Sequence, residues 1–320
     1  MNAETRGPIV LYIAGFGRSG STVLTNLLGE AEGAFAAGEV LQFRRAMSTD
    51  TCVCGCGRAS RECPVWEGVR TACNVSEQDA SALANVAHEL WRLRRLPAVA
   101  LGSQRLTRSK DFWNLAQRAE CLYRELARSQ RCNVIVDSSK TSAYAHLLKS
   151  ATSLDVRIVH LVRDARGVAH SWLREKRLPG APGRYMQRFP LRMSTLTWLA
   201  WNIVPEAMWR RRGQVRLGRY QLVRYEDFVR DPRQTARRIL AMVGLENARL
   251  PFLDEQTLEL APNHCLEGNP NRLLHGPIRM NPDEAWLEEM PRRDAWMLSA
   301  LTSPLLLHYG YPLRPRATGA

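Results

Sequence analysis

A glycine-rich segment at residues 15–22 has the residue types and spacing to hold an anion. It follows an apolar run, Ile9 to Ala14, that is typical of a buried strand, and it leads into a helical pattern from about Ser21 to Glu30. Glycines allow backbone geometry that side chains would block, and the amides at the start of a helix converge on a negative charge. The segment therefore predicts a phosphate-sized anion site.

The cation in this loop distinguishes it from a loop that holds ATP. Gly15, Gly20 and Thr22 fit the nucleotide-hydrolase pattern G-x-x-x-x-G-K-[ST], but Ser21 occupies the lysine position. The loop's own positive charge comes from Arg18. On this segment alone, an ordinary strand–turn–helix junction is an equal alternative to a phosphate site.

A second apolar run, Val156 to Val162, also ends in groups that suit phosphate. Arg163 and Asp164 follow it directly, and Ser171 lies eight residues beyond the arginine. A guanidinium group makes forked, charge-assisted bonds to phosphate, and a hydroxyl adds a donor. By itself Arg163 would equally be a solvated charge at a strand end, but together with the first loop it favours a phosphate contact.

These two motifs resemble the sulfotransferases that use 3′-phosphoadenosine 5′-phosphosulfate. The shared pattern is a first strand ending in Gly-x-x-Arg-Ser-Gly-Ser-Thr, and a later strand ending in Arg-Asp with a serine eight residues after the arginine. In that family the first loop cradles the 5′-phosphosulfate, and the Arg/Ser pair, here Arg163 and Ser171, binds the 3′-phosphate. The resemblance implies a three-layer α/β fold with a parallel sheet flanked by helices, similar to P-loop nucleotide hydrolases.

Other segments extend the resemblance through most of the chain, in the family's order. They are Val134 to Lys140 with its Asp-Ser-Ser-Lys ending, Leu222 to Phe228, Gly268 to Arg272, and Gly310 to Leu313. The resemblance implies that the donor is bound by Gly17, Arg18, Ser19, Gly20, Ser21, Thr22, Arg163, Ser171, Tyr225, Asn269 and Arg272. Arg272 is expected at the 3′-phosphate, and Tyr225 near the adenine or its phosphate.

Sulfuryl transfer to a hydroxyl needs a base near the loop that holds the sulfate. Some family members use a histidine two residues after the strand-end lysine, but Lys140 is followed by Thr141 and Ser142. Others use a glutamate in a Gly-Glu pair, which matches Glu39. Glu39 is therefore expected to be the base, with Arg18 and Lys140 stabilising the sulfuryl group and the leaving phosphate.

Alternatives to this catalytic assignment remain open in the sequence. Glu39 precedes a helical pattern, Val40 to Met47, so it could be an ordinary acid near a helix start, and Lys140 could belong to a structural ion pair. The rival bases are His146, His170 and His264. The chemistry itself requires no metal.

Five cysteines crowd into one region, at positions 52, 54, 56, 63 and 73. The spacing is not the repeated Cys-x-x-Cys of a strong zinc motif, so three alternatives stay open: a local disulfide or buried thiols bracing a substrate lid, a structural zinc in the Cys52–Cys63 segment, or no special role. The remaining cysteines, Cys121, Cys132 and Cys265, are expected to be small core residues.

Length and composition indicate one enzyme-sized domain. The chain has 320 residues, of which 45% are hydrophobic, and no linker or repeat divides it. We expect a single domain over residues 1–320, with a Cys-rich helical insertion at about 48–127 and a variable substrate loop at about 173–198. The polar N-terminus does not look like a secretory signal, and no apolar run approaches the ~20 residues that span a bilayer, so a cytoplasmic location is expected.

The net charge of +14 raises the alternative of a nucleic-acid-binding protein. The arginines are scattered, with the tightest cluster at residues 210–212, and no DNA- or RNA-binding motif accompanies them. A polyanionic co-substrate accounts for the positive net charge without nucleic acid.

A P-loop kinase with Asp137 holding magnesium is a further alternative, weakened by the missing loop lysine. The expected acceptor is a hydroxyl on a small molecule, sugar or lipid, and adenosine 3′,5′-bisphosphate is the expected product. The sequence leaves the oligomeric state open.

Overall fold

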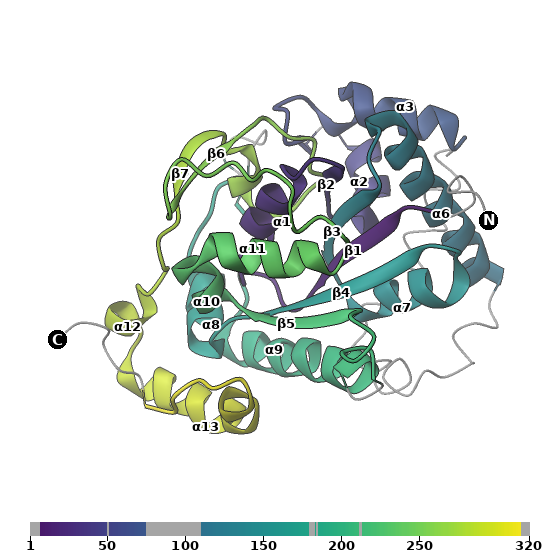
Figure 1. Cartoon of the computed structure of the whole chain (residues 1–320). Helices are drawn as coiled ribbons and strands as arrows, with labels where there is room; N and C mark the ends of the chain where they lie inside the picture. Colours follow the sequence, from purple (N-terminus) through teal and green to yellow (C-terminus); the bar gives the residue numbers. More distant parts are fainter. Residues whose placement is uncertain are drawn as a thin grey trace.

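A five-stranded parallel sheet forms the centre of the protein (Figure 1). The computed structural model describes residues 7–49, 51–74, 110–178, 183, 185–210 and 213–314. In the order of the sheet the strands are β2 (Ala34–Gly38), β3 (Val134–Lys140), β1 (Ile9–Ala14), β4 (Asp155–Val162) and β5 (Tyr220–Arg224). Because all neighbouring strands are parallel, their carboxyl ends lie along one edge, where open α/β sheets place ligands.

Alternate residues of the strands enter two separate hydrophobic cores, because side chains of a strand point to opposite faces. From β1, Val10 and Tyr12 pack on one face, whereas Leu11 and Ile13 pack on the other, and all four are fully buried. A strand buried on both faces needs a continuous apolar run, which is why these segments were recognisable in the sequence.

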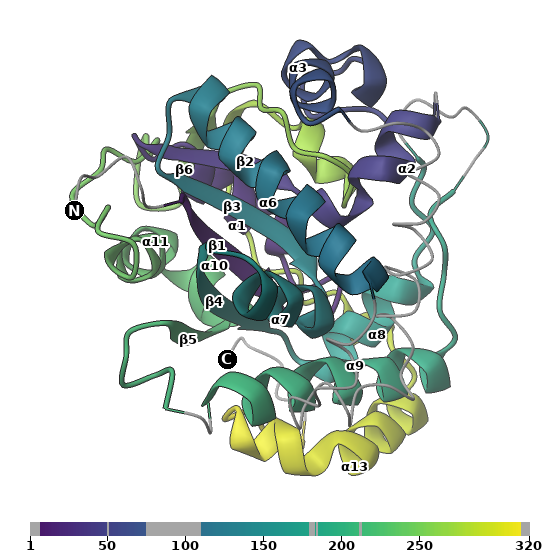
Figure 2. The ribbon, with the colours of Figure 1, turned by 90° about the vertical axis from the view of Figure 1, so that its right-hand side faces the viewer.

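Helices cover both faces of the sheet. On one face lie α3 (Pro64–Ala72), α6 (Lys110–Gln130) and α7 (Ser142–Ala151), and Figure 2 shows α6 and α7 in front of the strands. On the other lie α1 (Ser21–Gly29), α10 (Tyr225–Arg230) and α11 (Pro232–Ala241). The predicted three-layer α/β fold is confirmed.

The remaining elements extend the β4–β5 side of the sheet or cross its carboxyl edge. Those beside β4 and β5 are α8 (Ala165–Leu173), α9 (Leu191–Pro205), a π-helical turn η6 (Glu206–Arg210) and α13 (Arg292–His308). The others are η2 (Val40–Gln42), α2 (Phe43–Ser48), η3 (Ser60–Glu62), the antiparallel pair β6 (Thr257–Leu260) and β7 (Gly276–Arg279), η7 (Pro270–Leu273) and α12 (Trp286–Glu289). The helix expected over Val40 to Met47 is therefore a 3₁₀ turn followed by α2.

One cysteine expectation is wrong. Cys121 is not a simple core thiol, because it forms a disulfide with Cys73, 48 residues away, that joins the end of α3 to α6. Of the predicted insertion, residues 75–109 lie outside the described residues, as do residues 179–182 and 184 of the predicted substrate loop and residues 211–212 of the arginine cluster. The single-domain division stays a prediction.

No helix within the described ranges is long and apolar enough to cross a bilayer. The cytoplasmic location stays a prediction.

A fully buried histidine links β4 to the helix layer beside it. His160 Nε2 lies 3.0 Å from Asn202 Oδ1 on α9, and its Nδ1 lies 2.8 Å from the Tyr220 hydroxyl on β5. Asn202 uses its amide nitrogen to donate to Trp198 O, so its Oδ1 accepts from the imidazole, and the Tyr220 hydroxyl also lies 3.5 Å from Glu206 Oε1. Burial lowers the pKa of His160 to about 4, so the ring is neutral near pH 7.

This shift predicts a specific loss of stability in acid. Below pH ~6.5 the imidazole is protonated in the unfolded chain, but in the folded protein it stays neutral until about pH 4. The free energy of unfolding therefore falls as the pH falls, by about 2 kcal/mol between pH 6.5 and 5. In urea unfolding, the free energy of unfolding of His160→Gln should fall by about 2 kcal/mol less than that of the wild type between pH 6.5 and 5. This difference does not depend on how stable the variant is at pH 8. The exposed-site control His275→Gln should follow the wild type. Parallel curves for His160→Gln and wild type would contradict the assignment.

Candidate active site

A cavity of about 830 Å³ opens at the carboxyl edge of the sheet. Its wall includes the loop after β1 and residues that follow the other strands: Glu39, Lys140, Arg163 and Tyr225. The structure thus brings together side chains that the sequence singled out in five separate motifs. Of the predicted residues, the cavity is lined by Gly17, Arg18, Gly20, Ser21, Thr22, Glu39, Lys140, Arg163, Ser171, Tyr225 and Asn269.

The loop after β1 is packed too closely to carry side chains at two of its glycines. A Cβ on Gly15 would lie 2.3 Å from the Leu161 carbonyl oxygen, and one on Gly20 would lie 2.6 Å from the Tyr225 ring. Both glycines also have positive φ angles, 129° and 87°, which side-chain-bearing residues rarely adopt. Contacts with β4 and α10 therefore hold the loop and its amides at the N-terminus of α1.

Two side chains in this loop bury polar atoms that lack a partner. Among the described residues, Arg18 Nε, Arg18 Nη1 and Ser19 Oγ have no hydrogen-bond partner, although buried polar atoms are nearly always bonded. Arg18 is a non-glycine residue at φ 71°, and its guanidinium lies 4.9 Å from the Trp172 ring centroid. Unpaired donors beside a ring of loop amides fit an anion placed between them.

Three cations crowd this end of the cavity. Burial, and then the nearby charge of Arg174, lowers the pKa of Arg18. Burial, followed by Arg18 and Arg174, lowers the pKa of Lys176. Like charges held this close destabilise one another, so the arrangement gains from a bound polyanion. No local sequence pattern distinguishes Arg174 or Lys176 as a site residue, although both lie in the predicted substrate loop.

Arg163 joins the two halves of the site. Its Nη1 donates to the backbone oxygen of Arg18 at 3.0 Å, and its guanidinium lies 4.5 Å from the Tyr225 ring centroid. Asp283 pairs with Arg163 at 3.2 Å and also with Arg174, and its amide donates to the Tyr225 hydroxyl. Burial alone would raise the pKa of Asp283, but the two guanidinium groups outweigh it and hold that pKa below its usual value.

Ser171 is 2% exposed on α8 and lines the cavity with Arg163. Asp283 was not predicted as a site residue. Nothing in the local sequence around Asp283 indicates that it contacts Arg163, which lies 120 residues earlier.

Glu39 and Lys140 meet at the ends of β2 and β3. Lys140 Nζ donates to the Glu39 carboxylate and also to Ser138 O at 2.9 Å, with both side chains largely buried. A Cβ on Gly268 would lie 3.1 Å from Glu39 Oε1 and 3.5 Å from Thr22 Oγ1, so the carboxylate and the loop hydroxyl border the same small space. An acid and an amine thus stand beside the start of α1.

The segment after β6 returns across this edge. The Glu39 amide donates to Leu266 O and the Leu266 amide to Ala37 O, so the segment pairs with the end of β2. Asn269 lies beside the loop, with its amide 3.4 Å from Thr22 Oγ1.

Arg272 is placed differently from the expectation. Its guanidinium donates to the backbone oxygens of Val53, Gly268 and Asn269, and it is not among the residues that line the cavity as the structure describes it. Its contacts are those of a residue that holds the late loop in place.

The rival residues lie away from the cavity or are already engaged. None of His146, His170 and His264 is among the described residues that line it. His170 pairs with Glu289 at 3.1 Å. Asp137, the candidate magnesium ligand of a kinase, is completely buried, accepts bonds from the Tyr123 hydroxyl and the Ser139 amide, and has a pKa raised to about 6 by burial.

Four aromatic side chains, Phe16, Trp172, Phe189 and Trp201, form an aromatic wall of the cavity. Trp172 and Phe189 stack at 4.3 Å, and Phe16 lies 5.5 Å from Trp172 and 5.9 Å from Trp201. Trp172 is therefore held between Phe189 and the Arg18 guanidinium. Phe189 and Trp172 belong to or border the predicted substrate loop, and the wall gives the cavity an apolar side.

The chain is similar in sequence to two human carbohydrate sulfotransferases. Human carbohydrate sulfotransferase 5 is 31% identical over 157 residues (45% of this chain, 37% of the relative), and human carbohydrate sulfotransferase 3 is 26% identical over 176 residues (50% and 34%). The chain thus spans little more than a third of the length of these curated relatives.

Two solved structures share the fold over almost the whole chain. The sulfotransferase domain of the Synechococcus PCC 7002 olefin synthase superposes with a TM-score of 0.55 at 21% identity, covering 98% of this chain and 99% of that one. The sulfotransferase domain from the curacin biosynthetic pathway gives 0.50 at 18%, covering 97% and 100%. The family model described as "Sulfotransferase family" matches residues 8–249. Most of the chain is covered by that match, and the protein belongs to the sulfotransferase family.

Proposed function

We propose that the protein transfers a sulfuryl group from 3′-phosphoadenosine 5′-phosphosulfate to a hydroxyl of a small-molecule, sugar or lipid acceptor. The observation that carries the proposal is the glycine-rich cradle, in which buried donors of Arg18 and Ser19 lack partners within the described part of the chain. The family membership supports the same donor.

The donor's two phosphate ends would occupy the two cationic halves of the cavity. The 5′-phosphosulfate lies against the amides of residues 17–22 and the hydroxyls of Ser21 and Thr22. The 3′-phosphate binds Arg163 and Ser171, and it competes with Asp283 for the Arg163 guanidinium. Tyr225, which stacks on Arg163, borders the nucleotide, and Arg272 positions the loop that carries Asn269.

The transfer itself would be an in-line displacement at sulfur. The acceptor oxygen forms a bond to sulfur as the bond between sulfur and the bridging phosphate oxygen breaks, and the electron pair stays on the phosphate of adenosine 3′,5′-bisphosphate. Glu39 takes the acceptor's hydroxyl proton. Lys140, which contacts Glu39 in this structure, and Arg18 stabilise the charge that develops on the bridging oxygen.

The acceptor would enter between Glu39 and the aromatic wall. Gln42, Arg45, Lys176 and Tyr185 also line the cavity. Aromatic faces accept either an apolar chain or the C–H face of a sugar, while the polar groups orient hydroxyls. The chain's similarity to carbohydrate sulfotransferases supports a hydroxylated acceptor.

A small-molecule kinase is the competing function, and the burial of Asp137 weighs against it. Thermal unfolding separates the two. Adenosine 3′,5′-bisphosphate should raise the melting temperature in the absence of metal, because a ligand that binds only the folded state stabilises it. ATP with magnesium should not. The reverse pattern would favour the kinase.

Glu39→Gln keeps the size of the side chain and removes its ability to accept a proton. Turnover should therefore fall by a factor on the order of 10²–10⁴, while adenosine 3′,5′-bisphosphate affinity stays unchanged in calorimetry. The control Glu32→Gln, at an exposed acid of the same region, should keep both. Near-normal turnover of Glu39→Gln would exclude Glu39 as the base.

Arg163→Ala removes a charge-assisted contact to the 3′-phosphate that AMP never makes. The contact contributes roughly 1.5–3 kcal/mol, so affinity for adenosine 3′,5′-bisphosphate should fall by about 10- to 150-fold with little change for AMP. Arg230→Ala, at the solvent end of α10, is the control. Equal losses for the two nucleotides would remove Arg163 from this role.

A further inference from the structure

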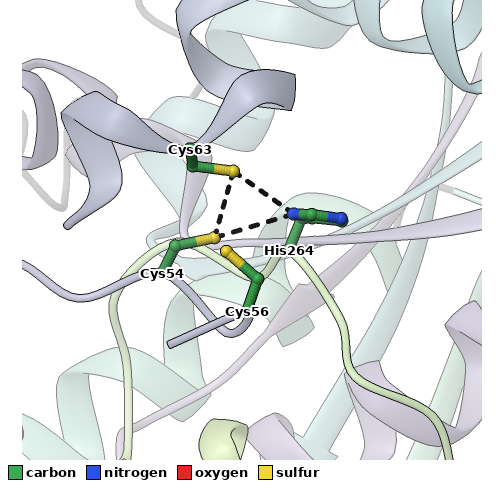
Figure 3. A group of neighbouring side chains, drawn as sticks. All are labelled: Cys54, Cys56, Cys63 and His264. Atoms are coloured by element: carbon green, nitrogen blue, oxygen red, sulfur yellow. Dashed lines mark hydrogen bonds between the residues drawn. The ribbon is translucent and has the colours of Figure 1, made fainter. Parts of the chain in front are cut away.

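Three cysteines and a histidine converge outside the active site. Figure 3 shows the sulfur atoms of Cys54, Cys56 and Cys63 gathered beside His264, although the histidine is 201 residues from Cys63. The four ligand atoms, three Sγ and the His264 Nδ1, all lie within 4.8 Å of one another. Cys52, the first cysteine of the segment, lies apart from them and bonds to the Glu267 carboxylate at 2.6 Å.

The distances among Cys54, Cys63 and His264 are close to the edges of a zinc tetrahedron. With Zn–S near 2.3 Å and Zn–N near 2.05 Å, sulfur–sulfur edges are about 3.8 Å and sulfur–nitrogen edges about 3.6 Å. The observed Sγ–Sγ distance between Cys54 and Cys63 is 3.6 Å, and their distances to His264 Nδ1 are 4.0 and 3.2 Å. A disulfide between those sulfurs would need about 2.05 Å.

The surrounding backbone is built to support thiolates. Cys63 is the N-cap residue of α3, so it lies at the start of a helix, where the backbone amides carry partial positive charge. Cys54 and Cys56 lie in a tight turn in which the Gly57 amide donates to Cys54 O at 2.9 Å and Gly57 has φ 84°. A turn fixed in this way sets the positions of the two thiols before an ion binds.

The histidine is also fixed in place from a distant part of the chain. Trp66 Nε1 donates to His264 O at 2.7 Å, and the Gly55 amide donates to Cys265 O at 3.0 Å. Cys54 and Cys63 are fully buried, whereas Cys56 and His264 are partly exposed, which leaves a route for an ion.

We propose that Cys54, Cys56, Cys63 and His264 bind one structural Zn²⁺ ion. The ion replaces the three thiol protons, which leave to solvent, and the site has four protein ligands with no position for a substrate. It joins the Cys54–Cys63 segment to the start of the 264–272 segment, which pairs with β2 beside Glu39. The zinc thereby holds the late loop of the active site without contacting the reaction.

Metal analysis of the full-length protein, purified without chelator, tests the site directly. We expect about one zinc per chain, absent from the double variant Cys54→Ser/Cys63→Ser and retained in Cys132→Ser, whose buried cysteine lies outside the cluster. Co²⁺ exchanged into the wild type should give the visible and thiolate charge-transfer absorption of a tetrahedral thiolate site, a readout that needs no variant to fold. A protein that takes up no zinc from added ZnCl₂, or a Cys54–Cys63 disulfide, would overturn the proposal. So would zinc retained by the double variant.

Hydrogen exchange of the wild type tests the role of the ion. Removing zinc with a chelator should accelerate amide exchange in residues 264–272 and leave α11 unchanged. This outcome is independent of sulfuryl transfer, so it stands or falls separately from the proposed function. Unchanged exchange in residues 264–272 after complete zinc loss would contradict the positioning role.

Discussion

The active site depends on how closely the turn between β1 and α1 packs against its neighbours. Gly15 lies against the backbone of β4, and Gly20 lies against the ring of Tyr225, with no room for a side chain at either position. This contact fixes the turn relative to β4 and α10, which carry Arg163 and Tyr225. In the proposed function, an anion bound by the turn is therefore held at a set distance from Arg163. Backbone proximity, more than any one side chain, defines the spacing of the site.

Some charged side chains of the cavity have partners of opposite charge, and Arg18 has none among the described residues. Asp283 neutralises Arg163 and Arg174, and Glu39 pairs with Lys140, whereas Arg18 has donors without partners among the described residues. Burying a cation without a partner is costly, so this arrangement is sustained by the packed core beneath it and relieved by an anion. Aromatic stacking fixes the guanidinium where hydrogen bonds do not, because Trp172 lies against both Arg18 and Phe189.

The segment from β6 to α12 assembles the site from the far end of the chain. Leu266 extends the pairing of β2, Asn269 contacts Thr22, and Asp283 reaches Arg163 and Tyr225. These contacts lie side by side along one edge of the sheet. Any interaction that fixes the position of the segment from β6 to α12 therefore also affects the shape of the cavity. The cysteine cluster at its start acts on the same segment from outside the cavity.

Local patterns in the sequence determined the strands, the glycine-rich loop and the fold class, because buried parallel strands require apolar runs and a cradle requires glycines. The resemblance to the sulfotransferases predicted Glu39 and Arg163 as site residues, and both line one cavity because the residues that follow parallel strands share one edge. Tertiary structure alone decided the partners: Arg272 bonds to carbonyls, Cys121 pairs with Cys73, and His264 joins the cysteines. These pairings depend on the paths of loops between distant elements, and hydrophobic periodicity carries no information about such paths.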